Sequence, residues 1–156
     1  FLYVGLMIRN NEPYLIEFNV RMGDPECQTI LPLLKSDFLN LILSCCSGNL
    51  DKHKIEWYNK KSLCVVLCSN GYPEKYNKNV IIRNFNKLRT DETNYIFHAG
   101  TKASNKETWA IGGRVLNFVS VSNSYKKCRN QVIKKIKELN WKNGFFRKDI
   151  GYKIID

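Results

Sequence analysis

The sequence lacks several features that mark particular protein classes. No stretch approaches the ~20 uninterrupted apolar residues that span a bilayer, and residues 1–8 carry neither a charged n-region nor a small-residue cleavage site. We therefore expect neither a membrane span nor a signal peptide. There is also no internal repeat, low-complexity tract or long linker, which favours one folded α+β unit.

The six cysteines lack the C-x-x-C spacing of a zinc or redox site. Cys45 and Cys46 are neighbours in a helical pattern, and Cys64 and Cys68 lie in an apolar run. These positions predict reduced, buried thiols in a cytoplasmic protein.

Acidic residues are scarce. The 14 Asp and Glu residues against 25 Lys and Arg leave a net charge of +11, which suits nucleic acid, an acidic membrane surface or a phosphorylated small molecule. Lysine and asparagine are spread through every segment, so a general compositional bias explains most of the excess. The sharper question is whether any basic residues converge on one site.

The chain is long enough to fold as a domain. Its 156 residues are 44% hydrophobic and 12% aromatic, and at this size folding removes about two-thirds of the unfolded chain's surface from water. The sequence opens inside an apolar run, which predicts a fragment that begins within a strand.

The first half predicts a hairpin and helices. Two apolar runs, residues 1–8 and 14–20, flank the turn signal Asn10-Asn11-Glu12-Pro13, a pattern typical of a β-hairpin. Two helices follow, over residues 27–34 and from a cap at Ser36 or Asp37 to Gly48.

The second half predicts mostly antiparallel sheet, closed by an amphipathic helix from Ser124 to Leu139 whose lysines form a solvated face. The predicted strands cover residues 62–69, 80–83, 95–98, 108–111 and 114–121.

The most informative segment is the second strand of the predicted hairpin. Since strand side chains alternate between faces, Glu17, Asn19 and Arg21 share one face. Carboxylate and amide oxygens suit Mg²⁺, and an arginine beside them can meet the charge of a phosphoryl group. The other reading is an ordinary amphipathic strand with a solvated polar face. In both readings the opposite face enters the core with Ile16, Phe18 and Val20.

An acidic turn, Gly23-Asp24-Pro25-Glu26, follows this row at once. Glycine allows close approach of the backbone to a ligand, so the acids are predicted to face the same cleft. In isolation the tetrapeptide also fits a plain surface turn.

At this point the sequence resembles the phosphoribosylamine-glycine ligase family, which belongs to the ATP-grasp superfamily. The stretch I-E-F-N-V-R-M-G-D-P-E, residues 16–26, is similar to the family's signature. The resemblance continues through Gly5-Leu6-Met7, Lys35-Ser36-Asp37, Gly71-Tyr72-Pro73, His98-Ala99-Gly100-Thr101-Lys102, Gly112-Gly113-Arg114-Val115-Leu116 and Arg147-Lys148-Asp149-Ile150-Gly151. It covers the C-terminal part of the family's enzyme.

The resemblance implies an activity and a division of the chain. The family joins glycine to 5-phosphoribosylamine, using ATP to form a glycyl phosphate, and yields glycinamide ribonucleotide in purine biosynthesis. Residues 1–60 would be the C-terminal part of an ATP-grasp domain, an antiparallel sheet with helices. Residues 61–156 would be a small mixed β/α domain on the substrate side.

The resemblance also implies site residues. Glu17 and Asn19 match the family's ligands for Mg²⁺ or Mn²⁺, and Arg21 matches an arginine that stabilises the acyl-phosphate step. Asp24 falls where related enzymes contact the ribonucleotide, so its carboxylate could orient the attacking amine.

Basic residues converge in two glycine-flanked motifs. Lys102 and Arg114 carry charges that suit the 5′-phosphate, with the backbone N–H groups of Gly100, Gly112 and Gly113 nearby. The alternative for each is a turn glycine beside a solvated base. His98 is expected to be a partly buried strand histidine rather than a general base.

The family's N-terminal α/β domain and nucleotide-covering lid match nothing in this sequence. We therefore expect the missing N-terminal part to be a partner, and this chain to be inactive alone. Two alternatives remain: another ATP-grasp carboxylate-amine ligase, against which the acidic turn and the His98 to Lys102 motif argue, and a nucleic-acid module built on the lysine-rich helix. No nucleic-acid motif supports the latter, so neither nucleic acid nor membrane is expected as a partner.

Overall fold

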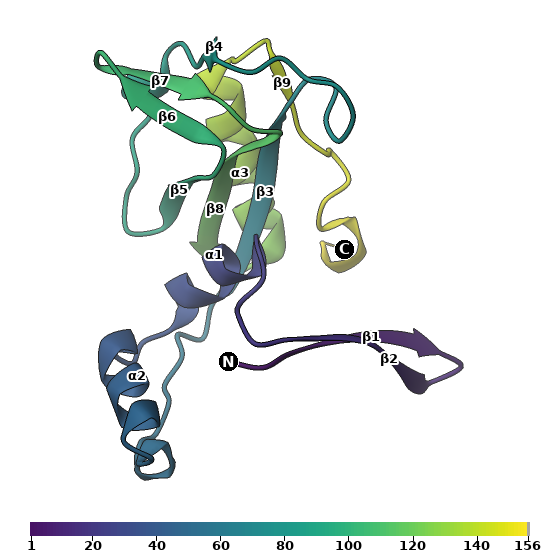
Figure 1. The fold of residues 1–156 in the computed structure, drawn as a ribbon, viewed down its shortest axis with the longest axis vertical. Helices are drawn as coiled ribbons and strands as arrows, with labels where there is room; N and C mark the ends of the chain where they lie inside the picture. The colour runs from purple at the N-terminus through teal and green to yellow at the C-terminus, as the bar shows by residue number, and fades with distance from the viewer. Residues whose placement is uncertain (156) are drawn as a thin grey trace.

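The computed structural model describes residues 1–155 and combines three antiparallel sheets with a few helices (Figure 1). Most buried side chains belong to a four-stranded sheet with the strand order β5-β8-β3-β9 and to the helix on it. Its strands are β3 (Lys61–Ser69), β5 (Asn94–His98), β8 (Arg114–Ser122) and β9 (Gly144–Phe145). The predicted α+β class is confirmed.

The core forms between this sheet and α3 (Tyr125–Leu139), which lies along its back in Figure 1. Ser124 starts the helix because its hydroxyl accepts a hydrogen bond from the Lys127 N–H at 3.3 Å. The helix buries one stripe, spaced by three or four residues, against alternate residues of β3 and β8. That cluster includes Leu63, Val65, Leu67, Leu116, Phe118, Cys128, Val132, Ile136 and Leu139.

A smaller sheet has the order β4-β7-β6 and consists of β4 (Val80–Ile81), β6 (Thr101–Ser104) and β7 (Glu107–Ala110). Strand β6 was not predicted, because its short polar sequence has no apolar alternation. It forms because Asn105 and Lys106 both adopt positive φ, 50° and 63°, which closes a tight hairpin to β7. Short 3₁₀ turns complete the chain: η1 (Leu31–Leu33), η2 (Leu50–Lys52), η3 (Phe85–Lys87) and η4 (Tyr152–Ile154).

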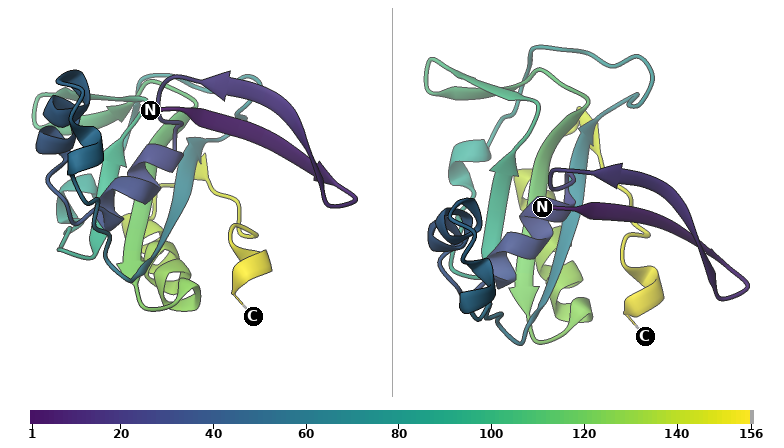
Figure 2. Two further views of the ribbon diagram at one scale, coloured as in Figure 1. Left: turned by 90° about the horizontal axis from the view of Figure 1, so that it is seen from below. Right: turned by 60° about the horizontal axis from the view of Figure 1, so that its bottom comes forward.

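The predicted N-terminal hairpin is present as β1 (Tyr3–Arg9) and β2 (Glu12–Asn19), and it projects away from the rest of the protein (Figures 1 and 2). The prediction that Ile16, Phe18 and Val20 enter the core is wrong: they are 62%, 60% and 86% exposed. Their alternation is typical of a half-buried strand, but no element of residues 1–155 covers either face of the hairpin.

Two helices link the hairpin to the sheet. Pro32 splits the first predicted helix into α1 (Glu26–Ile30) and η1, since proline lacks the N–H that would continue the ladder. The second, α2 (Phe38–Cys46), is capped by Asp37, whose carboxylate accepts a hydrogen bond from the Asn40 N–H at 2.7 Å. Ser36, the other candidate cap, instead accepts one from the Glu56 N–H.

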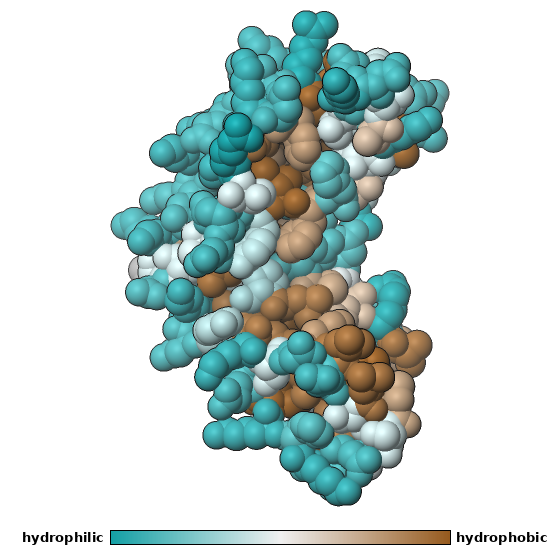
Figure 3. Space-filling model, turned by 90° about the vertical axis from the view of Figure 1, so that its left-hand side faces the viewer, coloured by the Kyte–Doolittle hydropathy of each residue, from teal (hydrophilic) through white to brown (hydrophobic). Residues whose placement is uncertain are grey.

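The six cysteines are free thiols, but only Cys128 is buried. Cys45 and Cys46 are exposed at the end of α2, so the prediction of packed thiols is wrong for this pair. Figure 3 shows hydrophobic side chains gathered on the surface around α2. The apolar pattern of this helix therefore does not mark a packed core. Within residues 1–155, no helix has the length and apolar character needed to cross a bilayer.

This division of the chain predicts unequal effects for one substitution at two positions. Leu116 is fully buried in β8, whereas Leu15 of β2 is 54% exposed. We expect Leu116→Ala to lower the free energy of unfolding by about 2–5 kcal/mol and Leu15→Ala to change it by less than about 0.5 kcal/mol. Urea denaturation followed by circular dichroism measures both. Equal losses would show that the hairpin is packed in solution.

Candidate functional site

The hairpin register places two of the predicted metal ligands on one face. Glu17 pairs with Gly5 and Asn19 with Tyr3, so both side chains lie on the same side of the ribbon. Glycine at position 5 makes room for the side chain of Glu17, because a Cβ there would lie 3.0 Å from Glu17 Cγ. No side chain among residues 1–155 forms an ion pair or hydrogen bond with the Glu17 carboxylate, which is therefore open to a ligand.

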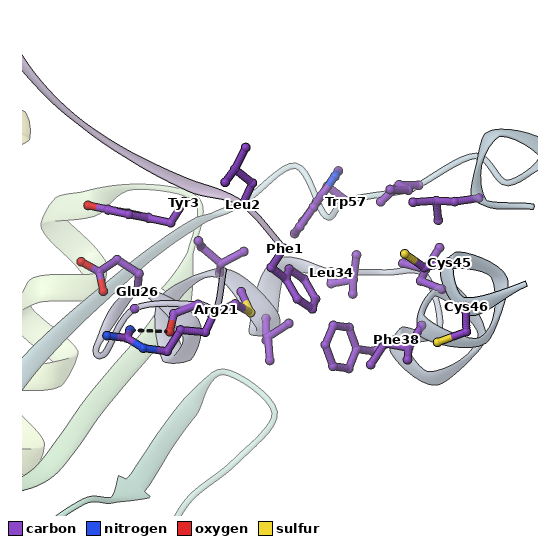
Figure 4. A pocket seen from close by; sticks show the side chains of 18 residues that line it. Phe1, Leu2, Tyr3, Arg21, Glu26, Leu34, Phe38, Cys45, Cys46 and Trp57 are labelled. Carbon is purple, nitrogen blue, oxygen red and sulfur yellow. Dashed lines mark hydrogen bonds between the residues drawn. The ribbon is translucent and has the colours of Figure 1, made fainter. Parts of the chain in front are cut away.

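Arg21 does not belong to this row as predicted, because β2 ends at Asn19. Its guanidinium Nη1 donates a hydrogen bond to the Met22 carbonyl at 3.2 Å. Figure 4 shows Arg21 and Glu26 at one end of a cleft whose other walls are apolar. Arg21 lies between the end of the strand and the acidic turn, where the chain no longer alternates, and its side chain lines the cleft.

The cleft has a volume of about 610 Å³ and lies between the hairpin base, α1 and α2. Phe1, Leu34, Phe38 and Trp57 contribute its apolar walls (Figure 4). The expectation that both acids of the turn face one cleft is wrong. Glu26 lines it and Asp24 does not.

Asp24 instead turns toward the four-stranded sheet and contacts Arg114, 90 residues away in sequence. The guanidinium Nη2 lies 3.2 Å from the Asp24 Oδ2, and Nη1 donates a hydrogen bond to the Asp24 backbone carbonyl at 2.9 Å. Both side chains are 43% exposed. Two residues that the sequence assigned to different tasks, amine orientation and phosphate binding, are therefore neighbours.

Two amides complete the surroundings of this carboxylate. Gln28 Nε2 donates a hydrogen bond to Asp24 Oδ1 at 2.7 Å, and Asn117 Nδ2 makes a longer contact with the same oxygen at 3.5 Å. The amide oxygens of Gln28 and Asn117 are buried and have no donor among the described residues. Asn117 was not predicted as a site residue, although a lone amide inside the apolar strand R-V-L-N-F-V-S-V-S indicates a buried polar contact.

Cys64 of β3 lies beneath the same turn. Burial, the largest cause, and the negative charge of Asp24 outweigh the opposite effect of a hydrogen bond with Thr29 and raise the pKa of its thiol to about 12. The thiol is therefore protonated at neutral pH and is a poor nucleophile. It serves as a marker of the packing of α1 on the sheet.

The glycine motifs have structural roles that limit what their N–H groups can bind. The Gly100 N–H donates to the Arg114 carbonyl at 2.8 Å, and the Gly112 N–H donates to the Gly100 carbonyl at 3.1 Å. A Cβ on Gly100 would lie 2.7 Å from Gly112 Cα, so glycine is needed for the close crossing of these segments. The Gly100 and Gly112 N–H groups are therefore already used within the fold, and their place near a phosphate stays a prediction. Of these three glycines, only Gly113 has an N–H without an acceptor among residues 1–155.

Lys102 lies on β6, opposite Trp109, with its side chain exposed. No ion pair of the described residues includes it. His98 is exposed rather than partly buried as expected: its Nδ1 lies 2.8 Å from the Thr101 hydroxyl, and its ring packs edge-on against Phe85. Those two contacts account for the histidine without a catalytic role.

Glu17 and Asn19 limit what metal the site can hold. In the described part of the chain no three His, Cys, Asp or Glu side chains cluster as metal ligands. One carboxylate and one amide oxygen fit a hard cation that completes its shell with water and phosphate oxygens, as Mg²⁺ does. They do not fit a closed structural metal site.

Comparisons with known proteins identify the family that this chain resembles. The family model described as phosphoribosylglycinamide synthetase, C domain, matches residues 62–153, and that of the ATP-grasp (A) domain of the same enzyme matches residues 1–27. A phosphoribosylamine--glycine ligase from Fusobacterium nucleatum is 46% identical over 151 residues, covering 96% of this chain and 35% of that protein. The chloroplastic phosphoribosylamine--glycine ligase of Arabidopsis thaliana is 39% identical over 158 residues, covering 99% of this chain and 30% of that protein.

A solved structure has the same fold. The crystal structure of phosphoribosylamine--glycine ligase from Thermotoga maritima superposes with a TM-score of 0.78 at 29% sequence identity, over 96% of this chain and 36% of that one. The chain thus spans about a third of the length of the relatives it matches. The family model covers more than half of the described residues, and the chain belongs to the phosphoribosylglycinamide synthetase family.

Proposed function

We propose that this chain supplies the metal-binding strand and the substrate-side domain of a phosphoribosylamine-glycine ligase. The observation that carries the proposal is the pair Glu17 and Asn19 on one face of β2, followed at once by an acidic turn that contacts Arg114 of the sheet. We assign residues 1–60 to the end of the ATP-grasp domain and residues 61–156 to the substrate-side domain. The matches of the two family models support this division.

The proposed reaction has two steps. A carboxylate oxygen of glycine attacks the γ-phosphorus of ATP, ADP leaves, and glycyl phosphate forms. The amine of 5-phosphoribosylamine then attacks the acyl carbon, loses a proton and displaces phosphate to give glycinamide ribonucleotide. Each step moves negative charge onto phosphate oxygens, so cations placed there stabilise the transition states.

Glu17 and Asn19 are the proposed ligands of Mg²⁺ or Mn²⁺, which would neutralise charge on the phosphates of ATP. The Glu17 carboxylate has no hydrogen-bond or ion-pair partner among residues 1–155, which suits a cation that shares its shell with substrate oxygens. Arg21, at the end of the cleft, is the proposed partner of the acyl phosphate.

Asp24 is the proposed acceptor for the attacking amine, and Lys102, Arg114 and Gly113 are the proposed phosphate ligands. Arg114 can serve both sides because a guanidinium carries five N–H donors and only two of its nitrogens contact Asp24. Gly100 contributes to this site by shaping the loop, since its N–H is already used.

The exposed hairpin supports a partner for this chain, namely the remaining part of the ligase. Apolar side chains on β1 and β2 lie open to water, and a two-stranded ribbon is marginal on its own. The matched relatives are about three times as long as the chain. We therefore propose that the chain is inactive until joined to that part, and that it works in the cytoplasm, where its six free thiols stay reduced.

The metal proposal is tested in a chimera in which this chain replaces the matching 35% of the Fusobacterium nucleatum ligase. We expect ADP release that requires both glycine and 5-phosphoribosylamine. Glu17→Gln is expected to lower kcat at least about a hundredfold, because a neutral amide binds the cation more weakly than a carboxylate.

Glu12→Gln is the matched control, since Glu12 lies on the same strand but pairs with Arg9 at the far end of the hairpin. It is expected to keep the activity. ATP binding without substrate-dependent ADP release in the folded chimera would refute the assignment to this ligase. An equal loss of kcat in both variants would refute the role of Glu17 as a metal ligand but not the assignment to this ligase.

The phosphate proposal predicts a separation of kinetic constants in the same chimera. Lys102→Ala is expected to raise KM for 5-phosphoribosylamine about tenfold with little change in kcat, because the lost charge-assisted contact is the same in the ground and transition states. The control is Lys126→Ala, another exposed lysine, on α3. An unchanged KM in Lys102→Ala would remove this residue from the phosphate site.

A further inference from the structure

We propose that Arg114, assisted by Asn117, is a positioning residue that holds Asp24 and the turn containing it in one orientation on the sheet. The two side chains come from one strand, β8, and reach the turn from below. The link to catalysis rests on the proposed function of Asp24, but the positioning itself can be measured in the 156-residue chain.

Arg114 makes two different contacts with Asp24, and their combination restricts the residue more than an ion pair does. Nη2 meets the carboxylate at 3.2 Å, and Nη1 donates to the backbone carbonyl of the same residue at 2.9 Å. One contact orients the side chain and the other holds the main chain of the turn. Lysine, with a compact ammonium, cannot match this planar two-point geometry.

Asn117 is the second support. It is 1% exposed, and a buried amide with an unpaired oxygen costs free energy relative to an apolar residue. Packing within β8 would be served better by an apolar side chain. The contact of Asn117 Nδ2 with Asp24 Oδ1, at 3.5 Å, gives the amide a role at this position.

Together with Gln28, these residues occupy most of the carboxylate. An ionised carboxylate offers about four acceptor positions, and the three side chains approach three of them, two at Oδ1 and one at Oδ2. The position that stays open is on Oδ2, beside Arg114. A substrate amine that binds Asp24 would therefore meet one defined oxygen instead of a rotating group.

The chain contains its own reporter for this arrangement. Cys64 lies beneath the turn and is partly buried, whereas Cys45 and Cys46 are exposed on α2 and serve as internal standards. Release of the turn uncovers Cys64 and accelerates its alkylation. The charge of Arg114 lowers the pKa of the Cys68 thiol, so its loss alone would slow alkylation there, whereas burial and the charge of Asp24 raise the pKa of Cys64. Faster alkylation of Cys64 therefore reports release of the turn and not the loss of the Arg114 charge.

The experiment measures iodoacetamide alkylation of each cysteine in the native chain by peptide mass spectrometry. We expect Arg114→Gln to accelerate the modification of Cys64 about fivefold and Asn117→Leu about twofold. Arg114→Lys should fall between Arg114→Gln and the unchanged protein. Arg147→Gln, which breaks an exposed pair with Asp149 on another part of the surface, should leave the rate unchanged.

Coupling to Asp24 separates positioning from a general loss of stability. In the Asp24→Asn background, Arg114→Gln should accelerate the alkylation of Cys64 by a smaller factor than it does in the unchanged protein. Equal factors in both backgrounds, or a Cys64 rate in Arg114→Gln equal to that in Arg147→Gln, would overturn the proposal. If Arg114→Gln does not fold by circular dichroism, Arg114→Lys and Asn117→Leu carry the same test.

In the chimeric ligase, Asn117→Leu is expected to lower kcat about tenfold without changing KM for ATP. A chimera that lacks ligase activity would refute the proposed function and leave the alkylation result to decide on positioning. An active chimera in which Asn117→Leu keeps full kcat would show that the orientation of Asp24 does not limit the reaction, and would overturn the link to catalysis.

Discussion

The contact between Asp24 and Arg114 is the constraint on which the arrangement of this protein depends. Residues 1–60 pack on the four-stranded sheet mainly through α1 and η1, and the two-point contact of the guanidinium fixes the turn from which α1 starts. The hairpin, which precedes that turn in the chain, makes no comparable contact with the four-stranded sheet. The place of Glu17 and Asn19 relative to residues 61–155 is therefore set where the turn, α1 and η1 meet the sheet.

The two parts on either side of this junction have opposite physical characters. The sheet with α3 has a closed core that residues 61–155 provide by themselves. The hairpin and the cleft beside α2 expose apolar side chains that the rest of the chain does not reach. Apolar side chains gathered on a surface in this way mark interaction sites, and in the proposed function the remaining part of the ligase covers them. The proposed metal ligands lie on this uncovered part.

Sequence patterns predicted the strands and the helix whose positions depend on neighbouring residues in the chain. Strands β3 and β8 and helix α3 match the predicted ranges within about one residue because their alternation and capping follow from burial against each other. The register put Glu17 and Asn19 on one face, as alternation required. The exposure of Phe18 could not be predicted, since strand alternation does not show whether another surface covers that face. The ion pair of Asp24 with Arg114 joins residues 90 positions apart, which no spacing rule connects. Arg21 does not share a face with Glu17 and Asn19, because the strand ends at Asn19 and the alternation ends with it.

The central claim is that this chain provides part of a site where glycine is activated through its own carboxylate. The most direct measurement uses the chimeric ligase with glycine labelled with ¹⁸O in both carboxylate oxygens, and mass spectrometry of the phosphate released. The account predicts one ¹⁸O atom in each phosphate, since the oxygen that attacks ATP leaves with the phosphoryl group. Unlabelled phosphate formed at the same rate as product would contradict the glycyl phosphate route, and with it the role assigned to β2 and its turn.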